Sequence, residues 1–208
     1  MGDRYVHLLG YGFKLNDLML NSLLNDCKGK MQYLNDAVII NMAKDYKIKL
    51  EEYEKYMYPP EVGGYKNSNF LLHKGIIKSI LEYFPIAEKY GVKINEIDLP
   101  QLSDVCETIK NAGGIPVIAH PYGMLDKNNL EKEIYEAINC GIMGVECYYP
   151  DHSEEITNLC LDICKKNDLL VTAGSDDHGE FNKVIDGVVY QIGEILKTPE
   201  NITLLKEI

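Results

Sequence analysis

The feature that most constrains the fold is a regular alternation of helix-like and strand-like segments between residues 99 and 178. Apolar and β-branched residues form three short runs, "IPVIAHP" (115–121), "MGVECYYP" (143–150) and "LLVTAGSD" (169–176). An amphipathic segment precedes each run, and each of these segments ends in glycine or in an Asn–Asp pair. This rhythm is typical of βα units, so the sequence predicts a parallel sheet with crossover helices.

Each predicted strand ends in residues that are costly to bury. His120 closes the first run, Glu146 and His152 lie on and after the second, and "SDDH" (175–178) follows the third. The last string alone fits two interpretations, a polar turn or a metal site at the carboxyl edge of a parallel sheet. Four of the five histidines lie on or just beyond a predicted strand, and that distribution favours a metal site.

Residues 16–96 have a different character. Helical periodicity appears in residues 16–27, 34–46 and 71–84, and a Pro- and Gly-rich stretch (59–64) breaks the region in two. His73 falls in this region and is expected to be packed or exposed on a helix. We therefore predict an α-helical subdomain, residues 16–96, inserted between two portions of an α/β domain, residues 1–15 and 97–208.

Composition narrows the range of partners. The net charge of −11 argues against binding to long nucleic acids or to anionic membranes. It does not exclude a small phosphorylated substrate, because bound cations invert the local field. The chain has no long apolar run, and its six cysteines contain no Cys-x-x-Cys pair. We expect a soluble, cytoplasmic protein with reduced, mostly buried thiols, among them Cys160 and Cys164 on one helix face.

Four strings, in order and spacing, resemble the polymerase and histidinol phosphatase (PHP) family of metal-dependent phosphoesterases. They are "VHLLGYGF" (6–13), "AGGIPVIAHPYG" (112–123), "GIMGVECYYPDHS" (141–153) and "LLVTAGSDDHGE" (169–180). The resemblance is to the nucleotide-phosphatase and oligoribonuclease branch, which carries a helical insertion. It implies the C-terminal part of a distorted (β/α)7 barrel and divalent ions, described as zinc, manganese, iron or magnesium, at the strand ends.

The resemblance also implies roles for individual residues. Asp177 occupies a variable position and is expected to be a solvated turn residue, whereas Glu146 is expected to be structural. His152 matches a histidine near the substrate phosphate. The implied metal ligands are His7, His120, Asp176 and His178, of which His120, Asp176 and His178 are also the implied catalytic residues.

The sequence departs from the family pattern before the "VHLLGY" strand. The family places a His-x-His strand and further ligands upstream, whereas this sequence begins five residues before Val6. The family's arginine after "AHP" is also replaced, here by "YGM". We therefore expect an incomplete site that binds metal weakly and turns over slowly, if at all. The first strand is expected to form an open sheet edge, which self-association could cover.

Three hypotheses follow. The first is a metal-dependent phosphoesterase acting on a nucleotide or short oligonucleotide phosphate, of which this chain is all or part. The second is a noncatalytic PHP-like module for binding or assembly, or a fragment of a longer enzyme. The third, an amidohydrolase-like metal hydrolase, fits the order of the "AHP" and "SDDH" strings least well. The sequence does not specify which metal or which phosphate ester is used.

Overall fold

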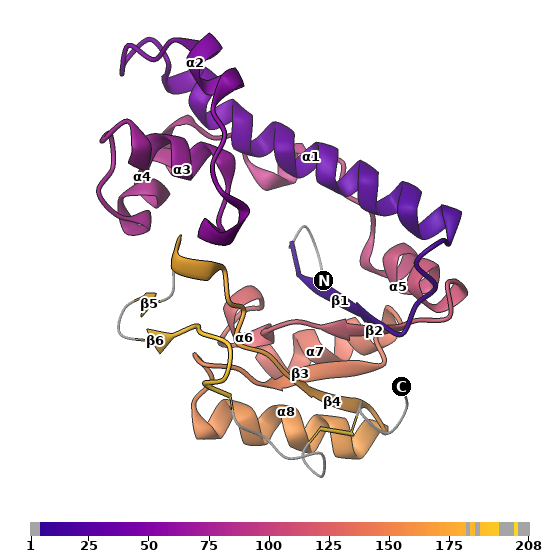
Figure 1. Ribbon diagram of the computed structural model, residues 1–208. Helices are drawn as coiled ribbons and strands as arrows, with labels where there is room; N and C mark the ends of the chain where they lie inside the picture. Colours follow the sequence, from indigo (N-terminus) through magenta and orange to yellow (C-terminus); the bar gives the residue numbers. More distant parts are fainter. Residues whose placement is uncertain (1–4, 182–183, 186–187, 196–201, 204–208) are drawn as a thin grey trace. The chain divides into compact units, whose positions relative to one another are not determined.

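A computed structural model describes residues 5–181, 184–185, 188–195 and 202–203. In this part of the chain it shows a mixed α/β fold with a four-stranded sheet and eight α-helices (Figure 1). The chain divides into two compact units. The sheet unit comprises Met1–Asn25, Leu99–Asp176 and Ile192–Ile208, and the helical unit comprises Asp26–Asp98 and Asp177–Gln191.

The sheet unit contains the predicted alternation of strands and helices. Its elements are β1 (Leu8–Tyr11), α5 (Leu102–Asn111), β2 (Ile115–Ile118), α6 (Pro121–Met124), α7 (Leu130–Asn139), β3 (Gly144–Tyr148), α8 (Glu154–Asn167) and β4 (Leu170–Ala173). Helix α1 (Leu18–Met42) contributes residues to both units. The predicted strands and helices between residues 99 and 176 are thus confirmed.

The strands of this unit lie in the order β1-β2-β3-β4. Strands β2, β3 and β4 are parallel neighbours, as predicted from the helix–strand alternation. Strand β1 instead runs antiparallel to β2, with Leu8 opposite Ile118 and Tyr11 opposite Ile115. The antiparallel direction has a consequence for the site, because it brings the residue before β1 to the edge where β2 ends.

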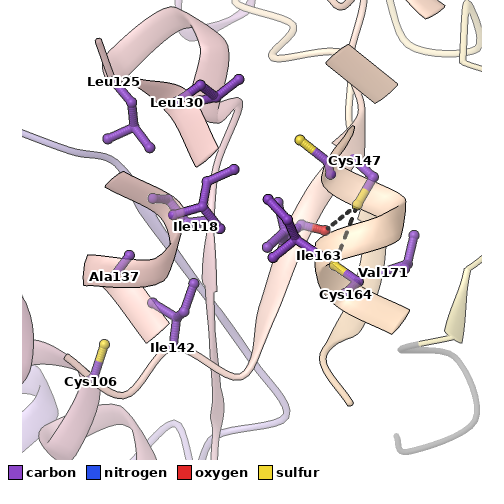
Figure 2. Packing of buried hydrophobic residues seen from close by; sticks show 13 residues of the cluster. Cys106, Ile118, Leu125, Leu130, Ala137, Ile142, Cys147, Ile163, Cys164 and Val171 are labelled. Carbon is purple, nitrogen blue, oxygen red and sulfur yellow. Dashed lines mark hydrogen bonds between the residues drawn. The ribbon is translucent and has the colours of Figure 1, made fainter. Parts of the chain in front are cut away.

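Helices α7 and α8 pack against the sheet through one apolar cluster (Figure 2). Its buried members include Ile118 and Val145 from the strands, and Ile134 and Ile163 from the helices. Burying side chains of this size contributes about 1.5–3 kcal/mol each. Hydrophobic periodicity therefore predicted this unit well, because the residues that follow the period are those in the core.

Cysteines fill part of the same core. All six are free thiols, and Cys106, Cys147, Cys160 and Cys164 are buried. The Sγ atoms of Cys147 and Cys164 lie 3.6 Å apart, between β3 and α8 (Figure 2). Burial raises the pKa of the Cys106 thiol to about 11 and that of Cys160 to about 12. These cysteines act as small apolar core residues, as predicted for Cys160 and Cys164.

The helical unit is made of short helices and one hairpin. Its elements are α2 (Leu50–Lys55), α3 (Lys66–His73), α4 (Tyr83–Tyr90), the 3-10 helices η1 (Pro60–Val62), η2 (Ile80–Glu82), η3 (Ile94–Glu96) and η4 (Gly179–Phe181), and strands β5 (Val184–Ile185) and β6 (Val188–Val189). Strands β5 and β6 pair antiparallel. Residues 26–42 enter this unit as the end of α1.

One helix prediction is wrong. Residues 71–84 were expected to form one helix, but α3 ends at His73 and α4 begins at Tyr83. Gly75 has a φ of +66°, in the left-handed region that a helix cannot continue through. The apolar spacing across the break is real, because Leu71 and Ile77 are both buried, but it is produced by two elements that enter one core.

The core of the helical unit combines apolar residues with a buried polar group. Ile39, Met42, Phe70 and Leu71 are almost fully buried in an apolar cluster. Beside Phe70 in sequence lie three buried polar residues in a row, Asn67, Ser68 and Asn69. A buried polar side chain requires hydrogen-bonding partners, and these three residues have them within the unit.

Asn67 is the centre of this polar group. Its Nδ2 donates to the carbonyl oxygen of Asn35 at 2.9 Å and contacts the Tyr83 hydroxyl at 2.7 Å. The Tyr53 hydroxyl donates to Asp36, and burial followed by this hydrogen bond raises the pKa of Tyr53. Hydrogen bonds of this kind tie α1 to α3 and α4 within the unit.

None of the helices in the described residues combines the length and hydrophobicity that spanning a membrane requires.

Candidate active site

The ends of three parallel strands and the start of β1 bring polar residues to one edge of the sheet. His120 follows β2, Tyr149 follows β3, and Asp176 follows β4 by three residues. Carboxyl ends of adjacent parallel strands lie at the same edge, where α/β folds bind ligands. Because β1 is antiparallel, His7 reaches this edge as well, and the backbone N–H of Ala119 donates to the His7 carbonyl at 3.1 Å.

His7 and His120 form an imidazole pair. Nδ1 of His7 lies 3.0 Å from Nε2 of His120, and the rings meet edge to face with centroids 4.9 Å apart. His120 is almost fully buried, with 4% of its surface exposed. The two imidazoles that the resemblance assigns to one metal site are thus in contact, and their role as metal ligands stays a prediction.

Asp176 and Tyr149 complete the group around His120. The Asp176 Oδ2 atom lies 4.0 Å from His120 Nε2, and the Tyr149 hydroxyl donates to the same oxygen at 3.5 Å. The ring of Tyr149 also lies 5.1 Å from the His120 ring. Tyr149 was missed by the sequence reasoning, although its position directly after a strand of the parallel sheet is the same signal that indicated His120.

The backbone at both His120 and Asp176 is in an uncommon conformation. His120 has a φ of +24° and Asp176 a φ of +52°. Among the described non-glycine residues, only Lys47 and Asp168 also have positive φ, and Asp168 caps the end of α8. Such residues cost free energy and cluster at functional sites, because the surrounding structure holds them there to aim a side chain.

Glu146 supports the backbone of His120. It is buried, and its Oε2 accepts a hydrogen bond from the His120 backbone N–H at 2.8 Å. Burial raises the pKa of the Glu146 carboxyl to about 7, the charge of Asp176 acts in the same direction, and the hydrogen bond from His120 opposes both. A Cβ at Gly174 would overlap Glu146 Oε1, so glycine leaves the space that this carboxyl occupies.

His152 has one nitrogen satisfied and one without a partner. Its Nδ1 lies 2.9 Å from the Cys147 carbonyl oxygen, which can only accept, so Nδ1 carries the proton. Its Nε2 is buried without a hydrogen-bond partner among the described residues. Burial lowers the pKa of the imidazole. The rings of Tyr149 and Tyr122 flank it at 5.3 and 6.3 Å.

The "SDDH" string is divided between the two units. Asp176 belongs to the sheet unit with His7, His120 and His152, whereas Asp177 and His178 belong to the helical unit. The backbone N–H of Gly179 donates to Asp177 Oδ1 at 2.7 Å, as in a polar turn. The convergence of His178 on His120 and Asp176 stays a prediction.

The geometry can be compared with what a divalent ion requires. Two ligand atoms at about 2.1 Å from one ion, about 90–110° apart, lie about 3.0–3.4 Å from each other. The 3.0 Å between His7 Nδ1 and His120 Nε2 fits this range, and the 4.0 Å to Asp176 Oδ2 exceeds it. Within the residues the structure describes, no three His, Cys, Asp or Glu side chains form a closed ligand group. The 3.0 Å contact is also that of a hydrogen bond between the two rings, with donor and acceptor set by their tautomers, and a carboxylate lies close by.

No family model matches the chain. A curated relative, phosphoribosyl 1,2-cyclic phosphate 1,2-diphosphodiesterase of Eggerthella lenta, is 32% identical over 102 residues. The match covers 49% of this chain and 37% of the relative. The chain therefore spans little more than a third of the length of the curated relative that it matches.

Two solved structures share the fold. One is called a metal-dependent phosphoesterase, from Bifidobacterium adolescentis, with a TM-score of 0.74 and 21% identity over 98% of this chain and 70% of that chain. The other, an amidohydrolase from Chromobacterium violaceum with bound sulfate and no metal, has a TM-score of 0.67 and 21% identity over 92% and 67%. Together with the curated relative, they confirm the resemblance to PHP-like phosphoesterases that the sequence motifs indicate.

Proposed function

We propose that this chain is all or part of a metal-dependent phosphoesterase that hydrolyses a small phosphate ester, such as a nucleotide or short oligonucleotide. The observation that carries the proposal is the His7–His120 pair, at ligand-to-ligand distance beside Asp176. The names of the curated relative and of one structural neighbour, a diphosphodiesterase and a metal-dependent phosphoesterase, support the reaction class.

The residues at the strand ends have two roles in this proposal. His7, His120 and Asp176 would hold a divalent ion, and the "SDDH" motif adds His178 to that set. The bound ion would polarise the phosphoryl group and activate water at neutral pH. His120, Asp176 and His178 are the proposed catalytic residues, and zinc, manganese, iron and magnesium all remain candidates.

Two further side chains would serve the substrate and the ligands. His152 keeps its proton on Nδ1 through the Cys147 carbonyl, so Nε2 carries a lone pair, and it is buried without a partner among the described residues. On gaining a proton, Nε2 would donate to a phosphoryl oxygen. Tyr149 would orient the Asp176 carboxylate through its hydroxyl.

The larger architecture is also a proposal. We infer that the sheet unit is the C-terminal part of a distorted (β/α)7 barrel and that residues 16–96 form the inserted subdomain between barrel portions 1–15 and 97–208. The Bifidobacterium adolescentis structure supports this, because it matches 98% of this chain and still extends beyond it. On this interpretation, residues 1–208 alone carry an incomplete ligand set and turn over slowly.

A noncatalytic module for binding or assembly is the second candidate. The observation that favours it is that no closed group of three ligands is present among the described residues. A module of this kind could use the outer edge of β1 for self-association, since β1 is the terminal strand in the order of the sheet.

Metal binding and turnover separate the two candidates. We would titrate the purified chain with Mn²⁺ by calorimetry and assay bis-p-nitrophenyl phosphate and AMP. His120→Ala should weaken Mn²⁺ binding by more than the ~10–100-fold typical of losing a supporting residue. His73→Ala is the matched control, because His73 lies on α3 against Tyr56 in the helical unit.

Three results are informative. Binding of one Mn²⁺ with low but metal-dependent turnover would support the phosphoesterase proposal. Binding that His120→Ala and His73→Ala leave equally intact would contradict the site. Absence of both binding and turnover would favour the noncatalytic module.

A further inference from the structure

A double-glycine turn in the helical unit lies directly against the backbone of His178. Gly63 and Gly64 follow η1 and have φ values of +73° and +70°. A Cβ at Gly63 would overlap the His178 carbonyl oxygen, and a Cβ at Gly64 would overlap the Phe181 ring. Glycine is required here for two independent reasons, a left-handed backbone and a close approach of two segments of the chain.

The approach is close from the opposite side as well. Gly179 has a φ of +73°, and a Cβ there would lie 3.0 Å from the Glu61 carbonyl oxygen and 3.1 Å from that of Val62. The end of η1 and its glycine turn thus meet the start of η4 backbone to backbone, with Gly63 on one side and Gly179 on the other. Such contact leaves no side chain between them that could adjust its rotamer.

The turn is itself fixed to the core of the helical unit. Buried Asn69 donates from Nδ2 to the Gly63 carbonyl at 2.8 Å, and the Tyr58 hydroxyl donates to the Gly64 carbonyl at 3.0 Å. Asn69 is 6% exposed and belongs to α3. Helix α3 therefore fixes the position of the turn. The turn then limits where the His178 carbonyl can lie.

We propose that the Gly63–Gly64 turn is a positioning element for the His178 imidazole. The inference rests on the proposed function, in which His178 is a metal ligand. The turn fixes the backbone of His178, and a ligand must be held within about 0.5 Å of its productive position.

The experiment compares Gly63→Ala with a matched glycine that lacks a neighbour. Gly75 lies in the same unit with a φ of +66° and no atom within 4 Å of a built Cβ, so Gly75→Ala introduces the same backbone strain without the overlap. Tyr58→Phe is a milder variant that removes only the hydroxyl bound to Gly64. Hydrogen exchange over residues 177–181 and Mn²⁺ affinity by calorimetry are the two measurements, with thermal unfolding as the folding check.

We expect Gly63→Ala to raise exchange over residues 177–181 and to weaken Mn²⁺ affinity about 10–100-fold, similar to His178→Ala. Gly75→Ala should change the affinity less than about twofold, because residual effects at uncoupled positions are small. The double variant Gly63→Ala/His178→Ala should be no weaker than His178→Ala, because the turn acts through that side chain. Tyr58→Phe should move both readouts in the same direction by a smaller amount.

The outcomes separate this inference from the proposed function. Unchanged exchange over residues 177–181 in Gly63→Ala would overturn the positioning inference, whether or not the chain binds metal. So would losses of Mn²⁺ affinity that add in the double variant. Increased exchange in Gly63→Ala together with no Mn²⁺ binding by the wild-type chain would instead contradict the proposed function and leave the structural part of the inference standing. If Gly63→Ala does not fold, Tyr58→Phe decides by the same exchange criterion.

Discussion

The two units are stabilised by different chemistry. In the sheet unit, aliphatic side chains and thiols fill the space between the strands and α7 and α8. In the helical unit, an apolar cluster around Phe70 adjoins buried amides and tyrosine hydroxyls that must find specific partners. Apolar cores tolerate substitutions of similar volume, whereas a buried polar network loses stability when any one member is left unpaired. The helical unit should therefore tolerate less sequence change per buried residue.

Helix α8 of the sheet unit has a side-chain cap that α2 and α3 of the helical unit lack, although α5, α6 and α7 of the sheet unit lack one as well. In the sheet unit α8 begins with Ser153, whose hydroxyl accepts a hydrogen bond from the backbone N–H of Ile156. In the helical unit α2 follows Lys49 and α3 follows Tyr65, and neither residue supplies a side-chain cap. Tertiary packing therefore stabilises these short helices more than their own ends do.

The largest expected effect comes from truncating each apolar core. Phe70→Ala should lower the free energy of unfolding by about 3–5 kcal/mol, and Ile134→Ala by about 2–5 kcal/mol, because each leaves a cavity where a fully buried side chain was. Urea denaturation measures the loss of unfolding free energy in each variant. Hydrogen exchange shows which residues lose protection.

The exchange pattern tests whether the comparison of two units is meaningful. Phe70→Ala should reduce protection mainly in residues 26–98, and Ile134→Ala mainly in residues 99–176. If either variant reduces protection equally throughout both ranges, the units unfold as one and the comparison fails.

A smaller effect is expected from the polar network. Asn67→Ala removes the hydrogen bonds to the Asn35 carbonyl and the Tyr83 hydroxyl and should cost about 1–3 kcal/mol. Asn41→Ala is the control, since exposed Asn41 donates to the Tyr90 carbonyl and its loss should stay within about 0.5 kcal/mol. Equal losses of thermal stability in the two variants would show that burial of the network contributes nothing.

The smallest effects concern helix starts. Ser153→Ala should cost about 1 kcal/mol in denaturant unfolding, because it removes the cap of α8. Lys49→Ser should instead stabilise by up to about 1 kcal/mol, since Lys49 is extended and Glu52 lies three residues later, as in a capping box. A loss of stability in Lys49→Ser would mean that the lysine contributes more than its weak contact with Glu52 suggests.

The sequence predicted the sheet unit better than the helical unit, and the two cores explain why. Ile118, Val145 and Val171 follow the periods that pattern analysis detects, so β2, β3 and β4 were predicted correctly. The burial of Asn67–Asn69 could not be detected from the hydrophobic pattern, because consecutive polar residues are typical of a loop. The break at Gly75 was missed because the apolar spacing continues across it.

For the site, strand ends indicated His120 and Asp176, and the family resemblance added His7. These side chains lie near one another, while their roles as ligands stay a prediction. The left-handed backbone of His120 could not be predicted, because it is imposed by the step from β2 into α6 and not by its own residue type. The role proposed for Tyr149 depends on a hydroxyl contact with a residue 27 positions away, which no local pattern encodes.

Gly174 and Glu146 occupy one shared volume, and this makes them an epistatic pair. Because a Cβ at position 174 would overlap Glu146 Oε1, alanine there should be tolerated only when position 146 carries a shorter side chain. Position 146 cannot be shortened freely either, since its carboxyl holds the His120 backbone N–H. In a library that varies both positions, folded variants should combine a larger residue at one position with a smaller residue at the other. Single substitutions alone would therefore misjudge which residues each position tolerates.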